Sequence, residues 1–219
     1  MRQKDYSYLL WFFIPYFIYV TVLLVTILMT DKGMLHLTMN QYHTPFLDSF
    51  FRYYTELGAS LPFVIAIGYL FYKVGSSLYI LVTLGINALV TNGLKLVFRE
   101  PRPIVYFQLF YPDHSLPLVE GVKVYSHNGF PSGHTSAAFA LMICIVLMSK
   151  RKDIALIAFI LAALLGFSRV YLSQHFTEDV LFGSAVGISV GLILYTLYHR
   201  YVEKKQGCLR MPITKVLKR

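Results

Sequence analysis

Long apolar runs separated by short polar segments dominate this sequence. A membrane-spanning helix needs about 20 mostly apolar residues, and six stretches reach or approach that length: 8–29, 57–72, 78–98, 135–148, 154–171 and 180–198. The second and fourth are short and must borrow flanking residues. No repeat, low-complexity tract or linker interrupts the pattern. It predicts one all-α domain over residues 1–219, an integral membrane bundle of six transmembrane helices.

Composition supports the membrane interpretation. Only 14% of the 219 residues are charged and 56% are hydrophobic, whereas soluble domains carry about 25% charged residues. The net charge of +9 would suggest nucleic acid in a soluble protein. Here the basic residues crowd into the short connections, so we expect no nucleic-acid partner. Cys144 lies in an apolar run and Cys208 in the basic tail, too far apart to form a disulfide.

The basic residues also predict an orientation, because cytoplasmic loops carry more Lys and Arg. With six spans both termini share one side. That side holds 13 basic residues: Arg2, Lys4, Lys73, Lys150, Arg151, Lys152, Arg200, Lys204, Lys205, Arg210, Lys215, Lys218 and Arg219. The other side holds seven: Lys32, Arg52, Lys95, Arg99, Arg102, Lys123 and Arg169. We therefore expect a multi-pass plasma (inner) membrane protein with both termini cytoplasmic. We interpret the basic C-terminal tail mainly as a topology signal, and attraction to anionic lipid is the alternative.

One segment in the first outward connection is amphipathic. Between residues 46 and 56 the apolar positions keep a helical period, while Asp48, Ser49, Arg52 and Glu56 fall on the opposite side. This pattern is typical of a helix lying in the membrane interface. An extension of the second spanning helix explains it equally well.

Polar and ionisable residues near membrane depth are costly, so they indicate function. Three clusters of them fall at the outward ends of predicted helices. The first runs from Lys95 to Pro103, the second is Pro131-Ser132-Gly133-His134, and the third runs from Ser168 to Asp179. The 13 basic residues that predict the cytoplasmic side lie outside these clusters, so the position of the clusters on the opposite face is a separate indication of a shared site.

The clusters contain the parts of a phosphate site. Lys95, Arg102 and Arg169 would bring three positive charges together, and Arg donates paired hydrogen bonds that match phosphate. Ser132 and Gly133 stand where a helix begins, so free backbone N–H groups and the helix dipole would favour an anion there. Taken singly, each motif has an ordinary structural explanation, such as a helix start or a proline stop.

Two histidines supply reactivity. A neutral imidazole can attack a phosphoryl group whose charge is offset by cations. His175 and Asp179 are four residues apart, so on a helical turn the carboxylate would fix the imidazole tautomer. The other histidine, His134, would then donate a proton to the leaving oxygen and later activate water. The cations would replace the metal ions that many phosphoryl-transfer sites use, so we expect no metal and no cofactor.

These motifs resemble the signature of the type 2 phosphatidic acid phosphatase (PAP2) superfamily: Lys-x6-Arg-Pro, Pro-Ser-Gly-His and Ser-Arg-x5-His-x3-Asp. Every motif position is matched. The resemblance implies that His175 is the nucleophile, supported by Asp179, and that His134 is the acid and base. It implies that the phosphate is held by Lys95, Arg102, Ser132, Gly133 and Arg169. The choice of His175 over His134 as nucleophile rests on this resemblance.

The resemblance implies a phosphatase acting on a membrane lipid phosphate or diphosphate. The cation cluster predicts that it needs no metal, and the charge balance predicts that it acts at the non-cytoplasmic face. Phosphatidylglycerophosphate, phosphatidic acid, polyprenyl diphosphates and lipid A are the candidate substrates. A lipid phosphotransferase is the main alternative, because water and a second lipid compete for the same phosphohistidine. An anion transporter is less expected, because transporters place substrate sites near the midplane. The sequence assigns no role to Asp113, His114 or His127, and it leaves the substrate and the oligomeric state open.

Overall fold

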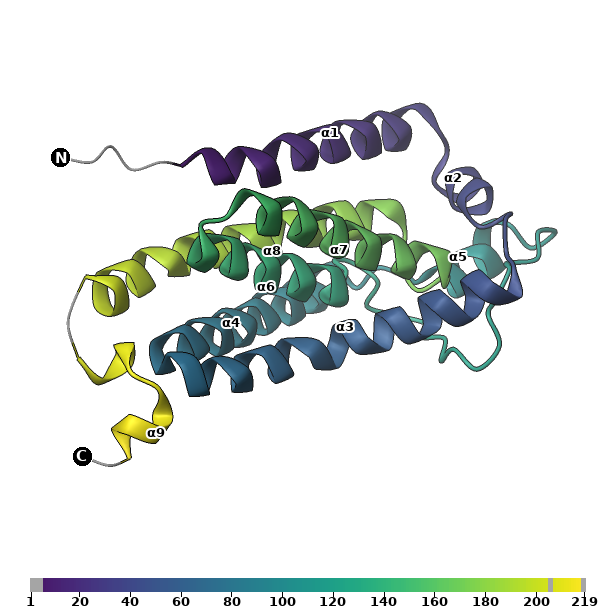
Figure 1. Cartoon of the computed structure of the whole chain (residues 1–219). Helices are drawn as coiled ribbons and strands as arrows, with labels where there is room; N and C mark the ends of the chain where they lie inside the picture. Colours follow the sequence, from purple (N-terminus) through teal and green to yellow (C-terminus); the bar gives the residue numbers. More distant parts are fainter. Residues whose placement is uncertain (1–5, 205–206, 218–219) are drawn as a thin grey trace.

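The computed structural model describes residues 6–204 and 207–217, and every regular element in these ranges is helical (Figure 1). The elements are α1 (Ser7–Met29), α2 (Lys32–Met39), α3 (Pro45–Tyr72), α4 (Val74–Phe98), α5 (Pro103–Phe110), α6 (Gly133–Ser149), α7 (Lys152–Tyr171), α8 (Thr177–Tyr198), a π-helical turn (His199–Glu203), a 3-10 turn (Cys208–Arg210) and α9 (Ile213–Val216). The all-α prediction is confirmed.

Six of these helices form the membrane bundle. In the described residues, five helices (α1, α3, α4, α7 and α8) are long and apolar enough to cross a membrane, and α6 is a shorter apolar sixth. The two short stretches do gain flanking residues, since α3 begins at Pro45 and α6 at Gly133. The protein is therefore a multi-pass membrane protein.

The structure distinguishes the two interpretations of the amphipathic segment in the first long connection. The amphipathic segment 46–56 is the beginning of α3, which continues without a break to Tyr72, so the extension is observed. A separate short helix, α2, does lie in this connection, but at Lys32–Met39. Asp31 caps α2 by accepting hydrogen bonds from the Gly33 and Met34 amides. Eight residues give too short a periodic pattern to be recognised in the sequence.

The bundle has two chemically distinct ends. The start of α1 and the C-terminal segment lie at one end, whereas α2, α5 and the long connection from α5 to α6 lie at the other (Figure 1). Lys73 and Lys150, which cap the C-termini of α3 and α6, lie at the first end. Five of the basic residues counted on the same side, Arg2, Lys4, Lys205, Lys218 and Arg219, lie outside the described residues.

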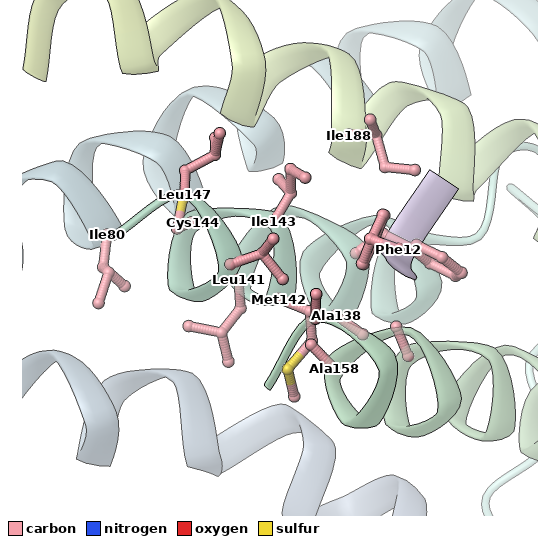
Figure 2. Close-up of a cluster of buried hydrophobic side chains, with 14 of the residues drawn as sticks. Phe12, Ile80, Ala138, Leu141, Met142, Ile143, Cys144, Leu147, Ala158 and Ile188 are labelled. Carbon is pink, nitrogen blue, oxygen red and sulfur yellow. The ribbon is translucent and has the colours of Figure 1, made fainter. Parts of the chain in front are cut away.

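The centre of the core is α6, which packs most extensively on α8 and α7. Its side chains lie in the middle of a cluster to which α1, α4, α7 and α8 contribute Phe12, Ile80, Ala158 and Ile188 (Figure 2). Cys144 is buried in this cluster and Cys208 is exposed, and both are free thiols, as expected.

Close approach of α8 to α6 depends on a row of glycines. Gly183, Gly187 and Gly191 recur every four residues on the face of α8 that contacts α6. A Cβ atom at Gly187 would lie 2.1 Å from the Ser136 carbonyl oxygen, and one at Gly183 would lie 2.7 Å from the Ser132 carbonyl oxygen. Small residues at this spacing let membrane helices pack backbone to backbone. The row brings the start of α8 directly against the start of α6, where the candidate site lies.

Candidate active site

The three polar clusters meet at the end of the bundle that carries α2 and α5. Each is placed by a helix end. Lys95 is in the last turn of α4 and Arg102 precedes α5, while Arg169 is in the last turn of α7. Ser132 is the N-cap of α6, and Asp179 is in the first turn of α8. His175 stands in the short turn between α7 and α8.

The predicted anion cradle lies at the start of α6. Lys95 lies close to it, because a Cβ atom at Gly133 would be 3.8 Å from the lysine Nζ. Ser132 is fully buried, and its Oγ accepts a hydrogen bond from the Thr135 amide and lies 2.8 Å from Thr135 Oγ1. When Thr135 is the donor between the hydroxyls, the Ser132 hydrogen remains free for a phosphate oxygen. The Ser132 amide donates to the Asp179 carbonyl at 3.0 Å, which joins α6 to α8.

The two arginines are buried and are held by neutral oxygens. Arg102 Nε donates to the His127 carbonyl at 3.0 Å, and its Nη1 donates to the Gln174 carbonyl at 3.1 Å. Arg169 Nη1 donates to Thr55 Oγ1 at 2.7 Å, while its buried Nε has no hydrogen-bond partner.

Among the described residues, Lys95, Arg102 and Arg169 form no ion pair with a carboxylate. Buried cations are costly unless an anion offsets them. The arrangement therefore suits a bound anion such as phosphate.

His175 and Asp179 form a buried pair. The His175 ring is 1% exposed, and its Nδ1 lies 3.2 Å from Asp179 Oδ2. The same carboxylate oxygen accepts a hydrogen bond from the Phe176 amide at 2.9 Å, which fixes its position. Burial, followed by repulsion from Arg102, Arg169 and Lys95, holds the pKa of His175 well below its ordinary value. A neutral imidazole with its proton on Nδ1 keeps a lone pair on Nε2.

His134 has different surroundings. It is the second residue of α6 and is exposed. It is close enough to His175 and to the cations Lys95, Arg102 and Arg169 to interact with them electrostatically. It also lines a groove of about 280 Å³ between α3, α4 and α6, together with Gly58, Ala59, Ala88 and Ala137. The groove connects the apolar flank of the bundle with the site.

Several contributing residues were not recognised in the sequence. Gln174 holds Arg102 through its carbonyl and donates from its side chain to the Lys123 carbonyl. Thr55 binds Arg169 from α3, 114 residues away in the sequence. Gln174 could have been predicted to belong to the site because it adjoins His175, whereas nothing in the sequence relates Thr55 to Arg169.

The connection from α5 to α6 contributes backbone carbonyls and one aromatic ring to the surroundings of the site. The His127 carbonyl holds Arg102, and the Tyr125 ring centroid lies 5.0 Å from the Arg102 guanidinium carbon. The His114 ring packs on Tyr111, and the side chains of Asp113, His114 and His127 are exposed. Within the described chain, these three side chains form no hydrogen bond or ion pair with a residue of the site.

Comparisons with known proteins agree with this geometry. The pattern of the PAP2 superfamily matches residues 76–203, which include every candidate site residue. The chain is 31% identical to a lipid A 4'-phosphatase of Porphyromonas gingivalis over 75% of this chain and 71% of that protein. It is 33% identical to phosphatidylglycerophosphatase B of Bacillus subtilis over 73% of this chain and 77% of that protein.

The fold has a counterpart among solved structures. A transmembrane PAP2-type phosphatidylglycerolphosphate phosphatase from Bacillus subtilis superimposes with a TM-score of 0.63. It is 26% identical, and the match covers 88% of this chain and 98% of that structure. The family match over residues 76–203, the two relatives and the shared fold agree, and the chain therefore belongs to the PAP2 superfamily.

Proposed function

We propose that this protein is a hydrolase that removes phosphate from a membrane lipid through a phosphohistidine intermediate. One observation carries the proposal: His175, which is buried and paired with Asp179, stands among three cations that have no carboxylate partner in the described residues. This combination suits a phosphate monoester, because the cations offset its charge while the imidazole supplies a nucleophile.

In the first step His175 Nε2 attacks phosphorus, and the bond from phosphorus to the lipid oxygen breaks. The imidazole gains positive charge, which the Asp179 carboxylate stabilises through Nδ1–H. His134 donates its proton to the leaving lipid oxygen, so the lipid departs as a neutral alcohol. Lys95, Arg102, Arg169 and the amides at the start of α6 stabilise the charge on the phosphoryl oxygens.

In the second step water attacks the phosphohistidine. Neutral His134 takes the proton of the water molecule, and the bond between phosphorus and Nε2 breaks. Inorganic phosphate leaves, while His175 is neutral again and His134 is protonated for the next cycle. The cations neutralise the charge on the phosphoryl oxygens, as metal ions do in many phosphoryl-transfer sites. We therefore expect turnover in the presence of a chelator.

The groove between α3, α4 and α6 supports a lipid substrate. It is lined largely by small and apolar side chains, and it reaches His134 from the flank that faces the membrane. An acyl chain could lie in this groove while the phosphate occupies the polar end of the bundle. The relatives are named for lipid A and phosphatidylglycerophosphate, and we add phosphatidic acid and polyprenyl diphosphates as candidate substrates.

The proposed orientation places the site at the periplasmic or exterior face. It follows from the charge balance, because 13 basic residues are assigned to the side of the termini and seven to the side of the site. Labelling of single cysteines introduced at exposed Asp113 and at Lys152 would test it in intact cells. An impermeant reagent should label position 113 only; labelling of position 152 only would reverse the orientation.

The reaction is tested by phosphate release from detergent-purified protein with EDTA present, across the four lipid classes. We expect release from one class well above the others, and none from His175→Ala. His114→Ala, a substitution in the exposed outward connection, serves as the matched control and should retain full activity. Absence of release by folded protein would contradict the hydrolase, and transfer to an added second lipid would then identify a phosphotransferase.

A further inference from the structure

Helix α2 packs against the turn that carries His175. Two buried polar residues belong to this segment, His36 in the helix and Asn40 at its C-cap, and each is 1% exposed. The His36 ring packs against Phe176 and Phe107, with centroids 5.1 and 5.8 Å apart. Burying polar side chains is costly unless hydrogen bonds satisfy them, so their partners indicate what they do.

His36 binds the turn between α7 and α8, and Asn40 binds the last turn of α7. His36 Nε2 lies 3.2 Å from Ser173 Oγ, and Asn40 Nδ2 donates to the Val170 carbonyl at 3.1 Å. Ser173 Oγ itself donates to the Pro117 carbonyl at 3.1 Å. A hydroxyl has one hydrogen, so Ser173 must accept from His36, and His36 carries its proton on Nε2.

The turn needs this support. Ser173 has a φ of 51°, a left-handed conformation that is unfavourable for serine. The two residues that follow act directly at the site: the Gln174 carbonyl holds Arg102, and His175 pairs with Asp179. A shift of the turn would therefore displace the nucleophile and one phosphate-binding arginine together.

Helix α2 is itself anchored to neighbouring elements. Asp31 accepts a hydrogen bond from the Tyr111 hydroxyl after α5. Lys32 pairs with Glu178 in the first turn of α8 at 2.6 Å, and its ammonium lies 4.3 Å from the centroid of the Phe176 ring. Burial lowers the pKa of His36 to about 3, so this histidine stays neutral near pH 7 and acts by hydrogen bonding alone.

We infer that His36 and Asn40 are positioning residues, which hold the turn from Val170 to His175 so that the imidazole meets the phosphoryl group in line. The inference rests on the proposed function. Neither side chain need touch the substrate. Displacement of a reacting group by about 1 Å can slow a reaction by about 100-fold.

The test compares four single variants and one double variant with the wild type on a lipid phosphate that the wild type hydrolyses. His36→Leu and Ser173→Gly each remove one side of the bond, and glycine tolerates the left-handed conformation of position 173. His36→Gln retains a donor at the place of Nε2. Thr38→Ala, on the exposed face of α2, is the matched control. Each is measured per unit of folded, monodisperse protein.

We expect kcat of His36→Leu and Ser173→Gly to fall by about 10- to 100-fold, with KM within about threefold. His36→Gln should recover most of kcat, and Thr38→Ala should match the wild type. The double variant His36→Leu/Ser173→Gly should lose no more than the worse single variant, because both act through one bond.

Full kcat in folded His36→Leu or Ser173→Gly, with only a lower melting temperature, would show a purely structural role and overturn the inference. Losses that multiply in the double variant would overturn it as well. If His36→Leu fails to fold, the kcat of Ser173→Gly alone still tests the inference. A wild type that releases no phosphate would instead contradict the proposed function.

Discussion

In the proposed reaction two histidines have different tasks, and their surroundings differ accordingly. His175 is buried, and Asp179 holds its Nδ1, so only Nε2 can act. His134 is exposed at the groove, where a lipid oxygen and water can reach it. A nucleophile benefits from a fixed tautomer, whereas a residue that gives and takes a proton needs access to both partners.

Asp179→Asn is the first residue-scale test. The amide keeps the size of the side chain but loses the charge that stabilises the imidazolium, so we expect kcat to fall by about 100-fold or more. KM should change little, because the phosphate-binding cations remain. Steady-state kinetics on a lipid phosphate measures both. A variant with wild-type kcat would show that His175 needs no carboxylate partner.

At this scale the sequence predicted the motif residues but not their supports. Lys95, Arg102, Ser132, Gly133, His134, Arg169, His175 and Asp179 all lie at one end of the bundle. Their roles remain predictions. Thr55 and His36 were missed because their partners, Arg169 and Ser173, are more than 100 residues away. Such contacts exist only once the helices have packed.

At the scale of elements, the glycine row on α8 sets the distance between the two helix starts that build the site. The Ser132 amide reaches the Asp179 carbonyl because α6 and α8 approach so closely. A side chain in this row would separate the helices and open the gap between cradle and nucleophile.

Gly187→Ala tests the row. A Cβ atom there would meet backbone atoms of Ser136, which cannot move aside as a side chain can. We expect a destabilisation of about 1–3 kcal/mol, seen as a lower melting temperature in detergent. Gly85→Ala is the matched control, since nothing lies within 4 Å of a Cβ at that position. Equal melting temperatures would mean that the two helices tolerate a wider spacing.

The elements themselves were largely predictable. Six apolar stretches correspond to six helices because length and hydropathy determine membrane spans. The short helices α2 and α5 were not predicted, since eight residues give little periodic signal. The amphipathic start of α3 allowed two interpretations, because a helical period alone does not show whether a helix lies in the interface or continues into a span.

At the scale of the whole molecule, the groove between α3, α4 and α6 connects the membrane flank with His134. The groove could not be predicted from the sequence, because the small residues that line it are common in membrane helices. We therefore expect the apolar part of the substrate to lie in the groove or the membrane and its phosphate to lie among the cations.

Ala88→Phe tests the groove. The added ring should fill part of it and lower kcat/KM for a lipid phosphate by about tenfold or more, while hydrolysis of para-nitrophenyl phosphate should change little. Leu89→Phe is the matched control, because Leu89 is 75% exposed on the same helix and does not line the groove. Equal losses on both substrates would place the acyl chains elsewhere.

The central claim is that His175 carries the phosphoryl group, and trapping that intermediate tests it most directly. Purified protein would be mixed with radiolabelled lipid phosphate, quenched in alkali during turnover and digested for mass spectrometry. The account predicts acid-labile phosphate on the peptide that contains His175, and no label or turnover in His175→Ala. Phosphate on His134, or continued turnover by His175→Ala, would contradict it.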